Sequence, residues 1–141
     1  MKVRDVMTKN VVRIHPEEPV EVAARTLTNY NIGAMPVCGR DGQICGVVTD
    51  RDLVTRCMAA GKIRATVRDV MTNRVVSVGP DMDAALAARL MGREQVRRLP
   101  VVEQGRLCGM VSLADLAATE EIGIDAADAL AEITANVQEK W

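Results

Sequence analysis

The chain has 141 residues, the length of roughly one domain, and 48% of them are apolar. It has no Phe, one Tyr and one Trp, which argues against a surface that stacks nucleic-acid bases on aromatic side chains. Its 18 basic and 19 acidic residues leave no general positive field for nucleic acid. No apolar run reaches spanning length and the N-terminus lacks an apolar signal segment, so we expect a cytoplasmic protein without membrane insertion.

The first part of the chain predicts the order strand, helix, strand, strand, helix. Prolines and acidic residues suit the first turn of a helix, alternation indicates strands, and glycines mark the turns and helix ends. The predicted elements are a strand over 10–14, a helix from 16 to about 30, strands over 34–38 and 43–49, and a helix over 50–60.

The second part repeats this order and adds a final helix. The predicted elements are a strand over 75–78, a helix from 81 to about 93, strands over 98–103 and 106–112, and a helix from 113. Beyond them, Asp125 is a candidate N-cap of a last helix. Its apolar stripe is predicted to cover its own domain or a partner subunit, and it consists of Ala127, Leu130, Ile133, Val137 and Trp141.

These two parts are copies of one another. The hexapeptide at 3–8 returns unchanged at 67–72, and residues 3–37 match residues 67–101 without a gap at 14 of 35 positions. The sequence is therefore a two-fold internal repeat. We expect four segments: a first repeat (1–61), a linker (62–66), a second repeat (67–120) and a C-terminal helix (121–141).

Each copy ends in a corner with the pattern Gly-x-x-Thr/Ser-x-x-Asp, where a strand runs into a helix. The residues are Gly46, Thr49 and Asp52 in the first copy, and Gly109, Ser112 and Asp115 in the second. A hydroxyl with an acid three residues later is also a helix capping box, which is a purely structural interpretation. Capping alone does not need the glycine, which suits close approach of another group to the backbone.

The tandem repeat resembles the CBS-domain pair, or Bateman module. The resemblance covers roughly residues 3–120 and rests on the repeated hexapeptide, on Pro36-Val37 and Pro100-Val101, and on the two corners. It implies an α/β (α+β) fold of two βαββα units packed about a pseudo-two-fold axis, here with an added C-terminal helix. It also implies two clefts between the units, each able to hold an adenosyl compound such as AMP, ADP, ATP or S-adenosylmethionine.

The corner chemistry agrees with that resemblance. A carboxylate accepts both ribose hydroxyl protons in charge-assisted hydrogen bonds, and a neighbouring hydroxyl can hold the same sugar. Thr49 with Asp52, and Ser112 with Asp115, are therefore predicted ribose clamps. The family pattern implies that apolar residues sandwich adenine, each cleft drawing them from the copy opposite its clamp. The predicted apolar contacts are Val12, Ile32 and Val48 in the first copy, and Val76, Val96 and Val111 in the second.

The two clefts are predicted to differ in charge. Before the Pro-Val strand the second copy has Arg97 and Arg98, where the family often places phosphate-binding cations, whereas the first copy has Gly33 and an alanine. In the first copy Arg51, inside the corner, is the candidate cation. The alternative for the arginine pair is a solvated strand edge or a surface ion pair, because exposed ion pairs are common and contribute little.

No catalytic constellation and no Gly-rich phosphate loop is found, so we expect a regulatory binding module rather than an enzyme. With one His and no CxxC, a metal site is not expected, and no cofactor is obligatory. We expect a homodimer that signals to an effector protein of unknown identity. The alternatives are a ligand-independent interaction module and a thiol redox switch at Cys38 and Cys45; DNA binding ranks last.

Overall fold

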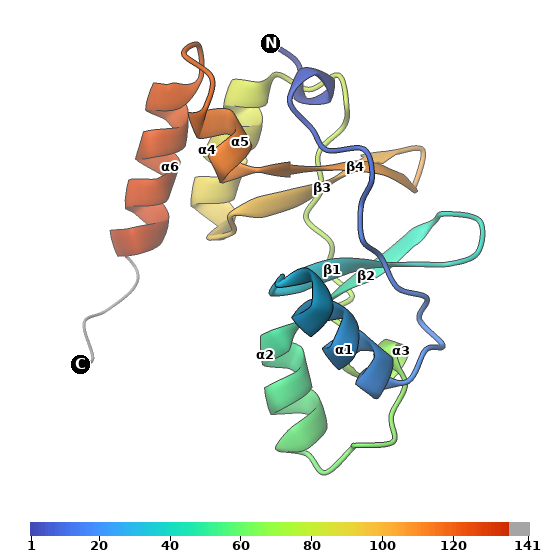
Figure 1. Ribbon diagram of the computed structural model, residues 1–141. Coiled ribbons are helices and arrows are strands. Elements are labelled where there is room, and N and C mark those ends of the chain that lie inside the picture. The colour runs from blue at the N-terminus through green and yellow to red at the C-terminus, as the bar shows by residue number, and fades with distance from the viewer. Residues whose placement is uncertain (136–141) are drawn as a thin grey trace. The chain divides into compact units, whose positions relative to one another are not determined.

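Each sequence copy forms one β-hairpin in the computed structural model, which describes residues 1–135 (Figure 1). In the first hairpin β1 (Ala34–Cys38) pairs antiparallel with β2 (Ile44–Thr49), and Ala34 lies opposite Thr49. In the second, β3 (Arg98–Glu103) pairs with β4 (Arg106–Ser112). Both turns contain a glycine with positive φ, 82° at Gly42 and 79° at Gly105. These strands confirm the predicted ones to within one residue.

A helix precedes each hairpin and another follows it. The preceding helices are α1 (Val20–Tyr30) and α4 (Ala84–Glu94), which end at Asn31 and Gln95 in the left-handed conformation. After the hairpins come α2 (Asp50–Asp52), which continues into the π-helical segment η2 (Leu53–Met58), and α5 (Leu113–Ala117). None of the described helices is long and apolar enough to cross a membrane.

The first predicted strand of each copy is not formed. Ile14 makes a single parallel bridge to Val37, and Val78 makes a single bridge to Val101. A proline explains why neither bridge grows into a ladder. Ile14 N–H donates to the Pro36 carbonyl (3.1 Å) and the Ile14 carbonyl accepts from Cys38 N–H (2.9 Å), but Pro36 has no N–H to donate to the Val12 carbonyl, where the ladder would continue toward the N-terminus. Pro100 ends the second ladder in the same way, since it accepts from Val78 N–H (3.1 Å) and cannot donate.

The two compact units of the structure exchange the opening segments of the two copies. One unit comprises 1–11, 76–104 and the chain from Cys108 onward; the other comprises 12–75 and 105–107. Val3, in the short 3-10 helix η1 (Val3–Asp5), is fully buried in the core of the unit built mainly from the second copy. Val67 and Val70, in α3 (Val67–Val70), are buried in the core of the other unit. We call these the second-copy unit and the first-copy unit.

The exchanged segments explain the glycine of each corner. Val47 and Thr72 exchange two backbone hydrogen bonds (3.0 and 2.8 Å), so the returning chain lies against Gly46. A Cβ atom on Gly46 would lie 2.8 Å from the Thr72 carbonyl oxygen, and one on Gly109 would lie 3.0 Å from the Thr8 carbonyl oxygen. The group that approaches each corner glycine is therefore the backbone of a repeated opening hexapeptide.

A methyl group at Gly46 is expected to destabilise the protein. Because the blocking atom is a hydrogen-bonded backbone oxygen, Gly46→Ala should lower the free energy of unfolding by about 1–3 kcal/mol, as overpacking does. Gly79→Ala is the control, because a Cβ at Gly79 meets no atom within 4 Å. Urea denaturation of the two variants gives the comparison. Equal urea midpoints for the two variants would show that the exchanged segment moves aside for the methyl group without loss of stability.

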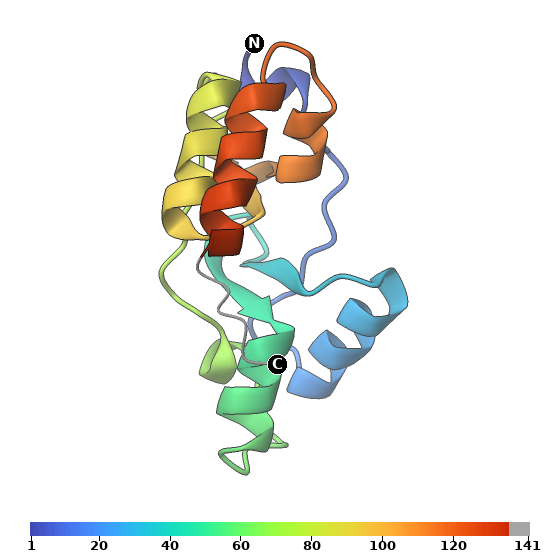
Figure 2. The same ribbon diagram turned by 90° about the vertical axis from the view of Figure 1, so that its left-hand side faces the viewer.

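The final helix α6 (Gly123–Ala135) packs against α4 and α5 within the second-copy unit (Figures 1 and 2). A Cβ on Gly92 would lie only 3.1 Å from Ala129 Cα, so α4 and α6 approach closely there. The expectation that this helix covers its own domain is confirmed, but its predicted start is wrong, and of its predicted stripe only Ile133 is buried among the described residues. The helix starts before Asp125, and its buried residues are Ala126, Ala129 and Ile133. Ala127 and Leu130 are exposed, and Val137 and Trp141 lie outside the described residues.

Candidate functional site

Both corners form complete capping boxes. The Thr49 hydroxyl accepts from Asp52 N–H (2.9 Å), and the Asp52 carboxylate accepts from Thr49 N–H (3.1 Å). In the second copy the Ser112 hydroxyl accepts from Asp115 N–H (3.1 Å), and Asp115 accepts from Ser112 N–H (3.3 Å). The structural interpretation is therefore correct as far as it goes. Each box uses only one carboxylate oxygen, Oδ2, so it leaves acceptor capacity for a ligand.

A backbone hydrogen bond ties each corner to the residue that precedes the Pro-Val strand. Asp50 N–H donates to the Gly33 carbonyl (2.9 Å), and Leu113 N–H donates to the Arg97 carbonyl (2.8 Å). Gly33 therefore lies beside the first corner, and Arg97 lies beside the second. Residues 64 apart in the repeat thus occupy equivalent places, and only the second corner has an arginine there.

The two corner carboxylates have different surroundings. Asp52 is only 6% exposed, and its oxygens also accept a hydrogen bond from the Thr72 hydroxyl (3.4 Å). Arg56 Nε lies 3.7 Å from Asp52 Oδ1, one helical turn away. Asp115 is partly exposed, and its carboxylate accepts only the capping bond among the described residues. The second corner is therefore the more accessible of the two.

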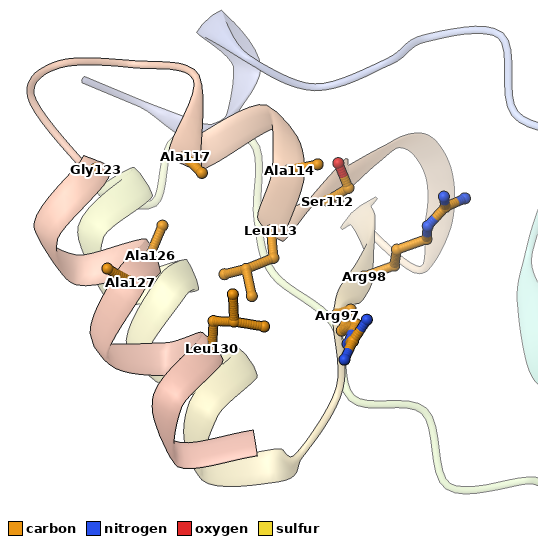
Figure 3. A pocket seen from close by; sticks show the side chains of 10 residues that line it. All are labelled: Arg97, Arg98, Ser112, Leu113, Ala114, Ala117, Gly123, Ala126, Ala127 and Leu130. Atoms are coloured by element: carbon orange, nitrogen blue, oxygen red, sulfur yellow. The ribbon is translucent and has the colours of Figure 1, made fainter. Parts of the chain in front are cut away.

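A cavity of about 470 Å³ opens beside the second corner, a size found for small-molecule pockets (Figure 3). Arg97, Arg98 and Ser112 of the predicted site lie on its wall, with residues of α5 and α6. Sequence analysis did not assign these helix residues to a binding site, although it placed Ala127 and Leu130 in the apolar stripe of the last helix. The helix residues on the wall are Leu113, Ala114 and Ala117 of α5, and Gly123, Ala126, Ala127 and Leu130 of α6.

The predicted apolar contacts fall into two groups. Val48 and Val111 have no exposed surface and belong to the two cores, so they support the strands beneath the corners and are not available to a ligand. The other four are partly buried and pack on the core of the unit that holds their own copy's corner. They are Val12 and Ile32 in the first-copy unit, and Val76 and Val96 in the second-copy unit. Their role as adenine contacts stays a prediction.

The described residues contain no group of three or more His, Cys, Asp or Glu side chains that could hold a metal ion. His15, the sole histidine, accepts a hydrogen bond at Nδ1 from Glu17 N–H (3.2 Å). That bond joins residues two apart, so His15 has a structural role in a local turn.

All four cysteines are free thiols. Burial raises the pKa of the Cys38 thiol above its usual value, and the positive charge of Arg13 offsets part of this effect. Burial likewise raises the pKa of Cys45 and of Cys108. Because the thiolate is the reactive form, these surroundings do not favour a thiol switch.

We expect the cysteine thiols to be alkylated slowly, and we expect the stability of the protein not to depend on whether they are reduced or oxidised. A raised thiol pKa lowers the thiolate fraction at neutral pH, so iodoacetamide should label the folded protein more slowly than the urea-unfolded protein, and labelling should accelerate as the pH rises. Full reduction should leave the melting temperature unchanged. A drop of about ten degrees on reduction would mean that a disulfide stabilises the fold, because 1 kcal/mol shifts the melting temperature of such a domain by about 2–8 °C.

Comparison with known proteins identifies the repeat. The family model described as "CBS domain" matches residues 3–59 and 67–120. The CBS domain-containing protein YhcV of Bacillus subtilis is 38% identical over 133 residues, which cover 94% of each chain.

Two solved structures show what similar chains bind. The structure of CBSX2 in complex with AMP has a TM-score of 0.71 at 26% identity, covering 94% of this chain and 98% of that one. The CBS domain pair of protein MJ0100, in complex with 5-methylthioadenosine and S-adenosyl-L-methionine, has a TM-score of 0.72 at 25% identity, covering 83% of this chain and 93% of that one.

Proposed function

The chain belongs to the CBS-domain family, and from that premise we propose that it is a regulatory module that binds an adenosyl compound and passes its bound state to an effector protein. AMP, ADP, ATP and S-adenosylmethionine are the candidate ligands. We propose no catalytic activity, because the sequence offers no catalytic grouping of side chains. The cytoplasmic location stays a prediction from composition.

One observation carries this proposal: the second corner has a partly exposed carboxylate, Asp115, and its hydroxyl residue Ser112 shares a cavity wall with two arginines. Asp115 Oδ1 accepts nothing from the described residues, and neither Arg97 nor Arg98 has an ion-pair partner among them. A carboxylate suits the two hydroxyls of a ribose, and guanidinium groups suit phosphate. CBSX2 binds AMP, which carries both a ribose and a phosphate, and this supports the same chemistry here.

A thermal-shift panel of AMP, ADP, ATP, S-adenosylmethionine and NADH tests the proposal. A ligand at 100 times its dissociation constant should stabilise the folded protein by about 2.7 kcal/mol. Guanosine and cytidine monophosphates are the controls, since they offer the same sugar and phosphate with a different base. If no adenosyl compound shifts the melting temperature at millimolar concentration, the protein is instead a ligand-independent interaction module.

We also propose that the protein forms a homodimer. The helical segment η2 leaves Val54 57% exposed and Met58 71% exposed, so the first-copy unit presents apolar side chains that a second subunit would cover. Light scattering at micromolar concentration should give twice the mass of the chain. A monomer mass under those conditions would contradict this prediction.

A further inference from the structure

The equivalent carboxylates of the two corners differ in what they can still accept. Asp52 is buried and is shared among its capping bond, the Thr72 hydroxyl and the Arg56 guanidinium. A ribose at Asp52 would have to displace these partners. Asp115 has no such competitors: the position equivalent to Arg56 is Thr119, whose hydroxyl donates to the Leu116 carbonyl (2.8 Å).

Thr8 is the residue equivalent to Thr72 in the repeat. Its N–H donates to the Met110 carbonyl (2.8 Å) and receives the Met110 N–H at its own carbonyl (2.9 Å). No hydrogen bond joins the Thr8 hydroxyl to Asp115 among the described residues. The second-copy carboxylate therefore keeps both lone pairs of Oδ1 for a ligand.

The charges beside the two corners also favour a phosphorylated ligand at the second corner. Asp50 occupies the place of Leu113, and its Oδ2 lies 3.4 Å from where a Gly33 Cβ would be, so a carboxylate lies beside the position that corresponds to Arg97. Arg51 follows Asp50 directly, and its backbone N–H donates to Asp50 Oδ1 (2.7 Å). Arg56 is already engaged with Asp52 and donates through Nη1 to the Met71 carbonyl (3.2 Å).

The first corner thus has Asp50 and Asp52 with Arg51 and Arg56, whereas the second has Asp115 and, on the wall of the adjoining cavity, Arg97 and Arg98. Two arginines and two carboxylates leave the first corner neutral, whereas two arginines and one carboxylate leave the second positive, so a dianionic phosphate is favoured at the second. An adenosyl ligand that carries phosphate should therefore discriminate strongly between the corners.

We propose that the chain binds one phosphorylated adenosyl ligand, at the Ser112–Asp115 corner with Arg97 and Arg98 on its phosphate, and that the Thr49–Asp52 corner is held by its own Arg56 and Thr72 and does not take AMP. This inference rests on the proposed function and adds to it the stoichiometry, the occupied copy and the residues that select phosphate.

Isothermal titration of the full chain with AMP and with adenosine tests it. AMP should bind with a stoichiometry of one per chain. The double variant Arg97→Gly/Arg98→Ala gives the second copy the residues of the first, and should weaken AMP about tenfold or more while changing adenosine affinity less than about threefold. Arg40→Ala/Arg106→Ala is the matched control: it removes two exposed arginines at the hairpin turns and should leave AMP affinity within about twofold.

The possible failures are distinct. Two AMP molecules per chain with equal affinity would overturn the inference and leave the proposed function intact. Loss of AMP binding in a folded Asp52→Asn variant, with binding retained in Asp115→Asn, would also overturn it, by placing the ligand at the other corner. No binding of any adenosyl compound to the wild-type chain would overturn the proposed function and this inference with it.

Discussion

Glutamate in place of Ala88 is expected to destabilise the protein by about 3 kcal/mol or more, whereas glutamate in place of Ala24 should change stability by less than about 0.5 kcal/mol. The two alanines are equivalent in the repeat, 64 residues apart. Ala88 has no exposed surface and lies one turn before Gly92, on the side of α4 that α6 covers. Ala24 is exposed on α1. A carboxylate at Ala88 would be buried without a cation to pair with it.

Urea denaturation followed by circular dichroism measures both variants. Ala88→Ser serves as a milder variant if Ala88→Glu does not fold, and it should lose less stability because a hydroxyl is cheaper to bury than a charge. Equal midpoints for Ala88→Glu and Ala24→Glu would mean that α6 leaves α4 readily, and that the packing of the final helix contributes little to stability.

Asp115→Ala is expected to weaken both AMP and adenosine, whereas Arg98→Ala should weaken AMP alone. Removing a charged hydrogen-bond partner costs about 1.5–3 kcal/mol, or roughly 10–150-fold in affinity. The proposed ribose contact of Asp115 is needed by every adenosyl ligand. Arg98 is proposed to meet only phosphate, so adenosine should bind the Arg98→Ala variant as it binds the wild type.

The comparison requires matched folding, because Asp115 also completes the capping box of α5. Melting curves of both variants should therefore be measured first, and titrations run well below the lower melting temperature. If folded Asp115→Ala binds AMP like the wild type, the second corner is only a helix cap. The proposed ribose clamp would then be wrong at the site that supports it best.

Local patterns in the sequence are enough to predict the hairpins, the helices beside them and the two corner capping boxes. The turn glycines, the Pro-Val strands and the Thr/Ser-x-x-Asp spacing act between residues close in the chain, so their effect does not depend on the rest of the molecule. The family resemblance rests on the same short motifs and is confirmed. The first strand of each copy fails for a reason that is not local: Pro36 and Pro100, on the strands that it would pair with, have no N–H to donate, and sequence analysis overlooked this pairing.

Two further features depend on tertiary contacts. The phase of α6 is set by the close approach of Ala129 to Gly92, and its small alanines give only a weak pattern from which to choose a face. The exchange of the opening segments is the clearer case. The hexapeptides at 3–8 and 67–72 are identical, so no property of either can indicate which corner glycine it packs against. Only the fold brings Thr72 to Asp52, and that contact makes two corners with the same motif chemically different.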